Sequence, residues 1–128
     1  MKIVIADDNN TDRLILKRIL KSFGGYEVHS AANGAEAVEL FQEVKPDIVL
    51  LDALMPVMDG YAATSAIRHA EATSGRPRIP IIGVTGDADV TQHETYMAAG
   101  MNACLVKPVT IKGLSRTIAR VVQRADEA

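Results

Sequence analysis

Short apolar runs, and one less apolar segment at Tyr26–Ala31, alternate with longer segments of helical periodicity, and this alternation strongly restricts the fold of the chain. The helical segments are too long for hairpin loops, so consecutive runs are expected to be parallel strands joined by right-handed crossovers. Strands as continuously apolar as Ile48–Leu51 suit a sheet that is covered on both faces. The pattern therefore predicts an α/β protein built from five βα units.

Turn and capping residues mark where the predicted elements end. Gly24-Gly25 stops the first helix, Asn33 can cap the second, and Pro46 blocks its continuation. The predicted architecture is a three-layer α/β/α sandwich, (βα)5, with a five-stranded parallel sheet of the flavodoxin-like order 2-1-3-4-5. The predicted strands are Lys2–Ala6, Tyr26–Ala31, Ile48–Leu51, Pro80–Thr85 and Ala103–Val106, and the predicted helices are Thr11–Phe23, Asn33–Val44, Tyr61–Ala72, Val90–Ala99 and Ile111–Arg124.

The composition is that of one globular domain. The 128 residues are 48% apolar and 23% charged, which argues against disorder and allows a single core. The net charge of -2 gives no general attraction to nucleic acid or anionic membrane, so neither is an expected partner. The lone Cys104, the lack of an apolar run long enough to span a membrane, and a first strand that begins at Lys2 favour a cytoplasmic location. We expect one domain over residues 1–128, with residues 124–128 as a candidate start of a linker.

Polar side chains follow four of the predicted strands. Asp7 and Asp8 come directly after the first strand, and Asp52 after the third. Thr85 ends the fourth strand and Lys107 follows the fifth. Open parallel sheets bind ligands at the carboxyl ends of their strands, so these five side chains are expected to meet at one edge.

This set of side chains suits a divalent cation and a phosphoryl group. Taken singly, Asp7-Asp8 could be loop or capping acids, Thr85 a strand-ending hydroxyl, and Lys107 a solvated lysine. Crowded carboxylates repel one another unless a cation lies between them, and oxygen ligands favour Mg²⁺ or Mn²⁺ over zinc. Asp52 could then act as a nucleophile toward phosphorus.

The sequence contains no loop that would hold a nucleotide. Neither G-x-x-x-x-G-K-[ST] nor G-x-G-x-x-G is present. The phosphoryl donor is therefore expected to be a phosphorylated protein or a small phosphodonor.

Short motifs stand at the ends of these strands: Asp7-Asp8, Asp52 within D-A-L-M-P-V-M-D-G, Thr85-Gly86 and Lys107-Pro108. In these motifs the chain resembles the receiver domain of bacterial two-component response regulators, and the resemblance covers essentially the whole sequence. It implies that Asp52 accepts a phosphoryl group from a histidine kinase or a His-containing phosphotransfer protein.

The resemblance also implies the ligands of the metal ion. Mg²⁺ would be bound by Asp8, Asp52 and the backbone carbonyl of Leu54, with Asp7 reached through water.

A second set of groups would bind the phosphoryl oxygens. The resemblance assigns this role to the side chains of Thr85 and Lys107 and to the backbone N–H groups of Ala53 and Gly86. It further implies a cis peptide bond between Lys107 and Pro108.

The chain departs from the usual pattern of this family at two positions. Leu105 stands where the family usually has a Tyr or Phe that moves inward together with Thr85 on activation. Leu54, two residues after the acceptor, replaces a residue that is often polar.

The function expected from this resemblance is a phosphorylation-operated switch rather than an enzyme. Phosphorylation would rearrange the surface formed by residues 90–99, 103–106 and 111–124, and so control an effector domain or a downstream protein, with a phosphorylation-dependent homodimer as one option. One alternative is a degenerate receiver that serves only as a protein-binding module. Another is an aspartyl-phosphate hydrolase of the haloacid dehalogenase type, which would need a second aspartate where this chain has Leu54.

Overall fold

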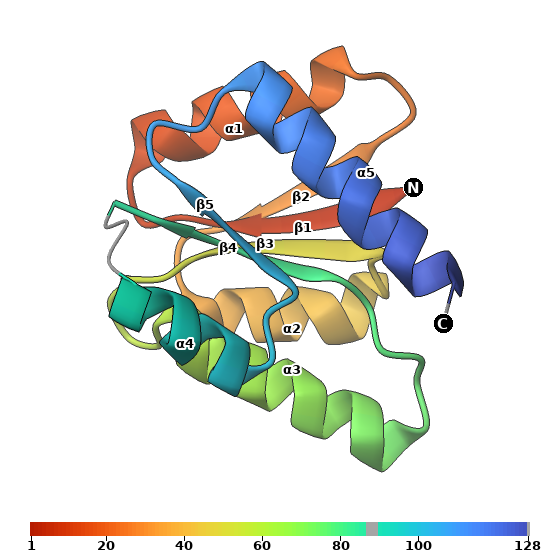
Figure 1. Ribbon diagram of the computed structural model, residues 1–128. Helices are drawn as coiled ribbons and strands as arrows, with labels where there is room; N and C mark the ends of the chain where they lie inside the picture. The colour runs from red at the N-terminus through yellow and green to blue at the C-terminus, as the bar shows by residue number, and fades with distance from the viewer. Residues whose placement is uncertain (87–89, 128) are drawn as a thin grey trace.

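The protein is a three-layer α/β/α sandwich around a five-stranded parallel sheet of order β2-β1-β3-β4-β5 (Figure 1). The computed structural model describes residues 1–86 and 90–127, except for the side chains of residues 90–93, 95 and 124–127. This strand order and the five βα units confirm the architecture predicted from the sequence.

The elements follow the predicted order, with small differences at their ends. The third helix extends to Ser74, two residues beyond the predicted Ala72. The last helix continues beyond the predicted Arg124 to Glu127, and no Gly or Pro interrupts this added stretch. The strands are β1 (Lys2–Ala6), β2 (Glu27–Ala31), β3 (Ile48–Asp52), β4 (Ile81–Thr85) and β5 (Ala103–Val106), and the helices are α1 (Asn10–Ser22), α2 (Gly34–Val44), α3 (Gly60–Ser74), α4 (Val90–Ala99) and α5 (Ile111–Glu127).

Three helices begin with side-chain caps next to the sheet edge that carries the polar residues. Asn9, Asn33 and Asp59 each accept a hydrogen bond from the backbone N–H group three residues further on. These bonds satisfy helix N–H groups that have no partner within the helix. They fix α1, α2 and α3 directly after the loops that leave β1, β2 and β3.

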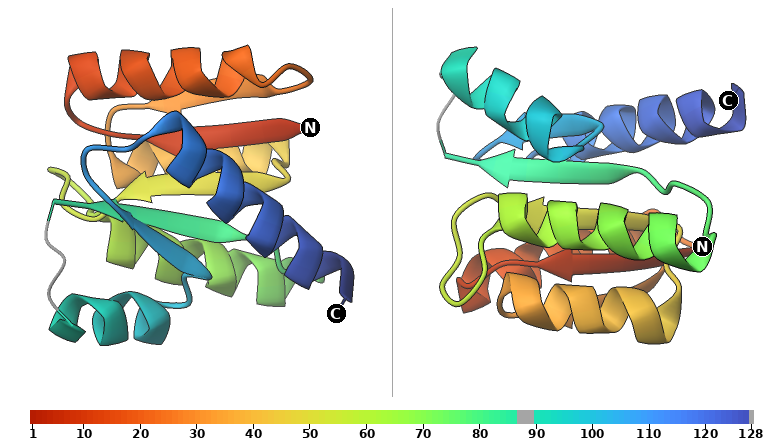
Figure 2. Two further views of the ribbon diagram at one scale, coloured as in Figure 1. Left: turned by 45° about the horizontal axis from the view of Figure 1, so that its top comes forward. Right: turned by 90° about the horizontal axis from the view of Figure 1, so that it is seen from below.

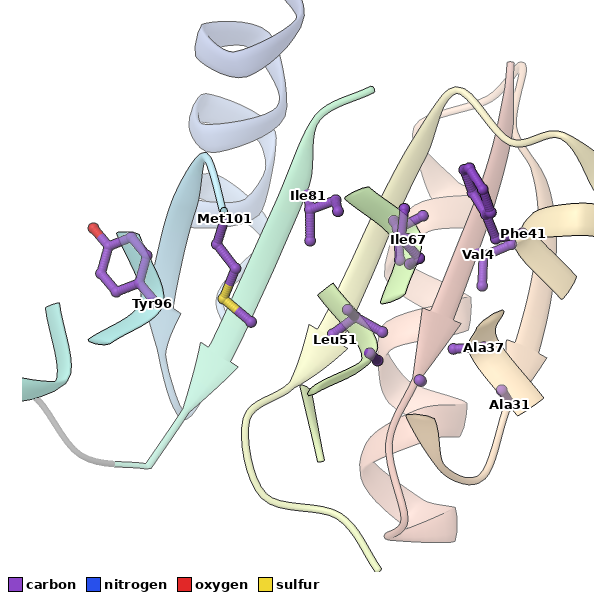
Figure 3. Close-up of a cluster of buried hydrophobic side chains, with 12 residues drawn as sticks. Val4, Ala31, Ala37, Phe41, Leu51, Ile67, Ile81, Tyr96 and Met101 are labelled. Atoms are coloured by element: carbon purple, nitrogen blue, oxygen red, sulfur yellow. The ribbon is translucent and has the colours of Figure 1, made fainter. Parts of the chain in front are cut away.

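Two apolar layers hold the helices against the sheet. Helices α1 and α5 cover one face and α2, α3 and α4 cover the other, as Figure 2 shows from two sides. On the second face Phe41 and Ile67 are fully enclosed, and Leu51 and Val4 reach them from the sheet (Figure 3). Because β1, β3 and β4 are buried on both faces, their apolar residues need not alternate with polar ones.

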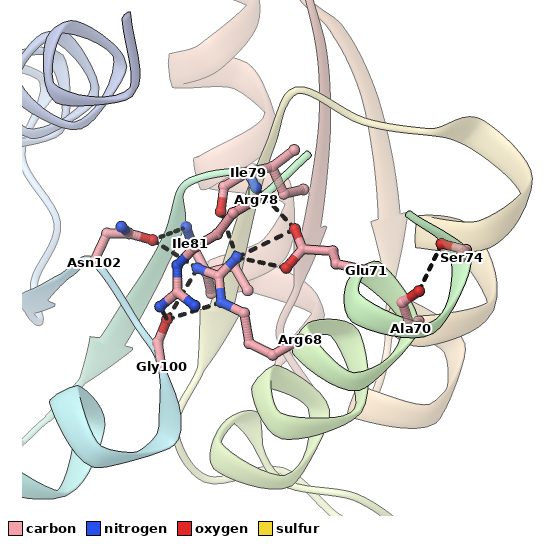
Figure 4. A network of polar contacts seen from close by, with 9 residues as sticks. All are labelled: Arg68, Ala70, Glu71, Ser74, Arg78, Ile79, Ile81, Gly100 and Asn102. Carbon is pink, nitrogen blue, oxygen red and sulfur yellow. Dashed lines mark hydrogen bonds and ion pairs between the residues drawn. The ribbon is translucent and has the colours of Figure 1, made fainter. Parts of the chain in front are cut away.

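Arg68 links α3 to the end of α4 through a buried polar network (Figure 4). Its guanidinium donates to the carbonyl oxygen of Gly100 from Nε at 3.0 Å and from Nη2 at 2.9 Å. The same group donates to the Asn102 side chain at 2.8 Å and to the carbonyl oxygen of Ile79 at 2.7 Å. Glu71 completes the network as the ion-pair partner of Arg68 at 2.9 Å.

Within the described part of the chain, no helix is both long enough and apolar enough to cross a membrane.

Candidate functional site

The polar residues predicted at the strand ends meet at one edge of the sheet. The register pairs Asp52 with Val84, and Thr85 with Val106, so the carboxyl ends of β3, β4 and β5 lie nearly level. Asp7, Asp52 and Thr85 are buried there, whereas Asp8 is exposed. The edge is therefore partly shielded from solvent and open on the Asp8 side.

Three carboxylates form a group that could hold a metal ion. One oxygen each of Asp7, Asp8 and Asp52 lies within 4.8 Å of the other two. Such an all-oxygen set, with one exposed member, fits a hard divalent cation that keeps several waters. Asp7 is oriented by the backbone N–H of Asn9, which donates to its Oδ1 at 2.9 Å.

The surroundings of Asp7 disfavour its charge in the absence of a cation. Burial raises the pKa of Asp7, and the charges of Asp52 and Asp12 raise it further. The hydrogen bond from Asn9 and the charge of Lys107 lower it, but they do not offset burial. A cation beside Asp7 would reverse this balance, because it favours the ionised carboxylate.

Lys107 places its ammonium against the carboxylate of Asp52. Its Nζ donates a hydrogen bond to Asp52 Oδ2 at 3.0 Å and lies 3.5 Å from Asp7 Oδ2. Partial burial alone would lower the pKa of Lys107, but the bond to Asp52 and the charges of Asp52, Asp7 and Asp12 outweigh it and raise that pKa. The ammonium is therefore charged at neutral pH and can pair with an anion at this edge.

Asp12 is a site residue that the sequence did not predict. It lies in the first turn of α1, and its Oδ2 is 3.5 Å from Lys107 Nζ. An acid in the first turn of a helix is ordinarily explained by its favourable interaction with the helix dipole. The sequence therefore gave no reason to expect that Asp12 would contact Lys107. The contact depends on how α1 packs beside the loop after β5.

The loop between β3 and α3 is held by two close approaches of glycine to backbone carbonyls. A Cβ on Gly60 would lie 2.3 Å from the carbonyl oxygen of Asp52, and one on Gly34 would lie 2.4 Å from that of Met58. Both contacts exclude any side chain. Between them Val57 has φ 69°, a left-handed conformation that is unfavourable for a β-branched residue.

The backbone N–H that bonds to the Asp52 carboxylate is that of Leu54, not that of Ala53. The N–H of Ala53 donates to the carbonyl oxygen of Val84 at 2.8 Å, because β3 stays paired with β4 up to Asp52. The N–H of Leu54 donates to Asp52 Oδ1 at 3.3 Å. The structure therefore corrects the expectation that the Ala53 N–H faces a phosphoryl oxygen, since this N–H is already used by the sheet.

The remaining predicted residues surround the same edge. Gly86, Lys107 and Pro108 help to line a cavity of about 430 Å³ beside Asp7, and the Lys107–Pro108 peptide bond is cis. Leu105 is half-buried and packs against the apolar layer under α1 and α5. No described contact links it to Asp52.

Comparison with known proteins identifies the family. The family model of the response regulator receiver domain matches residues 3–119. The chain belongs to this family. The five-stranded sheet of order 2-1-3-4-5 and the acidic edge described above are consistent with that membership.

Curated and solved relatives of this receiver domain include a fungal and a bacterial protein. "Two-component system protein A" of Emericella nidulans is 39% identical over 119 residues, which are 91% of this chain and 17% of that protein. The receiver domain of sensor histidine kinase PA1611 from Pseudomonas aeruginosa PAO1, solved with magnesium coordinated in the active site cleft, is 34% identical with a TM-score of 0.84, over 95% of this chain and 97% of that one.

A third relative was solved together with a partner. The receiver domain of Ssk1 in the co-crystal structure with the Saccharomyces cerevisiae histidine phosphotransfer signaling protein Ypd1 is 26% identical with a TM-score of 0.88, covering 94% of this chain and 88% of that one. The chain also matches "Probable transcriptional regulator ycf27" of Porphyridium aerugineum, of which it covers 50%. It therefore spans half or less of the length of these two curated relatives.

Proposed function

We propose that this receiver domain is a phosphorylation-operated switch in which Asp52 accepts the phosphoryl group. The observation that carries the proposal is the position of Asp52: its buried carboxylate lies beside two further acids and is hydrogen-bonded to the Lys107 ammonium. A carboxylate can attack phosphorus without a general base, because it carries no proton that must first be removed.

The proposed donor is a phosphohistidine of a histidine kinase or of a phosphotransfer protein. An oxygen of Asp52 forms a bond to phosphorus while the P–N bond breaks, and the electron pair of that bond stays on an imidazole whose other nitrogen is protonated. The relatives support such partners, since one is a receiver of a sensor histidine kinase and another was solved with a histidine phosphotransfer protein.

A divalent cation fits the three carboxylates of this edge. Asp8, Asp52 and the carbonyl of Leu54 would hold Mg²⁺ or Mn²⁺, with Asp7 reached through water. When bound, the ion supplies charge neutralisation for the transferring phosphoryl oxygens.

The protein groups around Asp52 would receive the phosphoryl oxygens. Lys107 would move its hydrogen bond from Asp52 Oδ2 to one of them, and the hydroxyl of Thr85 and the N–H of Gly86 would bind another. The N–H of Leu54, which faces Asp52 Oδ1 at 3.3 Å, is the second backbone donor in this proposal.

The output of the switch would be a change in the surface formed by α4, β5 and α5. This surface would contact an effector domain, a downstream protein or a second copy of the chain. We propose that residues 1–128 act as one regulatory domain in the cytoplasm, consistent with the free Cys104, and that residues 124–128 lead toward a linker.

Incubation with acetyl phosphate and Mg²⁺ followed by intact-mass measurement tests this function. We expect one added phosphoryl group on the wild-type protein, none on Asp52→Asn, and none when a chelator removes the metal. Glu39→Gln, which removes an exposed carboxylate of α2, is the control and should be labelled like the wild type.

The same measurement separates the alternatives. Labelling of Asp52→Asn would contradict the assignment of the acceptor. A wild-type protein that stays unlabelled in Mg²⁺ would instead favour a receiver that serves only as a binding module.

A further inference from the structure

Three carboxylates contact the ammonium of Lys107, and Asp12 differs from the other two. Asp52 and Asp7 come from the sheet edge and are buried, at 3.0 and 3.5 Å from Nζ. Asp12 comes from α1, lies at 3.5 Å, and has a side chain that is 46% exposed. The metal-competent group found among the described residues consists of Asp7, Asp8 and Asp52, so Asp12 reaches Lys107 from outside that group.

The local structure of α1 does not require a carboxylate at position 12. The helix is capped by Asn9, whose side chain accepts the backbone N–H of Asp12 at 2.9 Å. Arg13, the neighbouring cation, instead donates to the carbonyl oxygen of Asp7 and to the Asn10 side chain. Among the ion pairs of the described residues, the partner of Asp12 is Lys107.

The space around Lys107 allows its ammonium to change partners. Asp12, Lys107 and Gly86 line the cavity of about 430 Å³, together with apolar side chains such as Ile15 and Val84. The apolar walls strengthen charge interactions inside the cavity compared with bulk water. An ammonium in this space would therefore respond to the removal of one of its three carboxylate partners.

We propose that Asp12 is a positioning residue, which holds the Lys107 ammonium on the α1 side of the site and so competes with an incoming phosphoryl group for it. The proposal rests on the proposed function of Asp52. At rest Lys107 is shared among three anions. On phosphoryl transfer the hydrogen bond of Lys107 must pass from Asp52 to a phosphoryl oxygen. The ion pair of Lys107 with Asp12 opposes that change.

The test is the rate constant of phosphorylation by acetyl phosphate, measured on the full chain in Mg²⁺ by intact mass. We expect Asp12→Asn to raise this rate constant roughly twofold to fivefold, the size expected for an ion pair that is half open to solvent. Asp12→Glu keeps the charge and should retain the wild-type rate. Glu39→Gln controls for the loss of one negative charge elsewhere and should also leave the rate unchanged.

A double-mutant cycle shows whether Asp12 acts through Lys107. In a Lys107→Met background, Asp12→Asn should have no further effect on the rate constant. Equal acceleration in both backgrounds would overturn the proposal, because it would show direct repulsion between Asp12 and the anionic donor. An unchanged or slower rate for Asp12→Asn alone would overturn it as well.

Magnesium titration separates this role from metal binding. Asp12→Asn should leave the Mg²⁺ affinity close to that of the wild type, whereas Asp8→Asn should weaken it. A similar loss of affinity in both variants would make Asp12 a metal ligand and overturn the proposal. Failure of the proposed function would be distinguishable, since it would appear as labelling of Asp52→Asn or as a wild-type protein that stays unlabelled in Mg²⁺.

Discussion

At the scale of single residues, Leu54 is the side chain that we expect to control how long a phosphoryl group on Asp52 would persist. It follows Asp52, the proposed acceptor, by two residues, its N–H bonds to Asp52 Oδ1, and its side chain is 74% exposed. Hydrolysis needs a water molecule in line with the bond between Asp52 and phosphorus. An apolar side chain beside that path offers the water no hydrogen bond. Asp87, two residues after Thr85 in the sequence, is a second candidate for this role, and it lies outside the described residues.

We expect Leu54→Asn to accelerate loss of the phosphoryl group severalfold at constant Mg²⁺, because the amide can orient the attacking water. The decay can be followed by intact mass after the phosphodonor is removed. Val57→Asn is the matched control, because it replaces an apolar side chain by the same amide on the same loop. Val57 is 85% exposed, and asparagine tolerates the left-handed backbone conformation of this position. Decay in Leu54→Asn that is no faster than in Val57→Asn would show that residue 54 does not control the lifetime.

At the scale of secondary-structure elements, the ion pair of Arg68 and Glu71 ties α3, α4 and β4 together. Both side chains are largely buried, and Glu71 Oε2 also accepts the backbone N–H of Ile79 at 2.8 Å. Arg68 donates to the carbonyl oxygen of Gly100 just beyond the C-terminal end of α4. A cation at this end interacts favourably with the helix dipole. This network fixes the end of α4 farthest from Asp52.

Removing Arg68 alone should be costly, because it leaves the Glu71 carboxylate buried without its cation. We expect Arg68→Met to lower the free energy of unfolding by about 3–5 kcal/mol, measured by chemical denaturation. Arg68→Met with Glu71→Gln should recover part of this loss, since glutamine is neutral and can still accept the N–H of Ile79. Arg78→Met removes an exposed cation with a weaker 3.4 Å bond to the same Gly100 oxygen. Equal losses in Arg68→Met and Arg78→Met would contradict the role of the buried pair.

The elements were more predictable from the sequence than the contacts between them. Continuous apolar runs identified β1, β3, β4 and β5, whereas β2 was predicted from the less apolar segment Tyr26–Ala31. The acids that follow β1 or end β3 identified the acidic edge. The network of Arg68 and the contact of Asp12 with Lys107 join residues far apart in the sequence, and charged residues on helices ordinarily indicate solvated faces. Ala53 was assigned a free N–H because the sequence does not show that pairing between β3 and β4 continues through Asp52.

At the scale of the whole molecule, the acidic edge is expected to lower the stability of the metal-free protein. The folded state raises the pKa of Asp7, chiefly by burial, so it holds the Asp7 proton more tightly than the unfolded chain does. The stability that this proton contributes is fully present below the ordinary aspartate pKa and is lost as the pH rises through the raised value. Above the raised pKa the ionised Asp7 is therefore a net cost to folding.

Asp7→Asn should remove this cost while retaining an oxygen that can accept the N–H of Asn9. In chelator at neutral pH, we expect the variant to have a higher free energy of unfolding than the wild type. The gain should shrink as the pH falls through the raised pKa of Asp7 and should vanish below the ordinary aspartate pKa of about 4. Denaturation at several pH values measures the difference, with Glu39→Gln as the control for the loss of one charge. Addition of Mg²⁺ should reverse the order, because binding to the folded state stabilises the wild type more than a variant that lacks one carboxylate. A destabilised Asp7→Asn protein in chelator would mean that the pairing of Asp7 with Lys107 outweighs its burial.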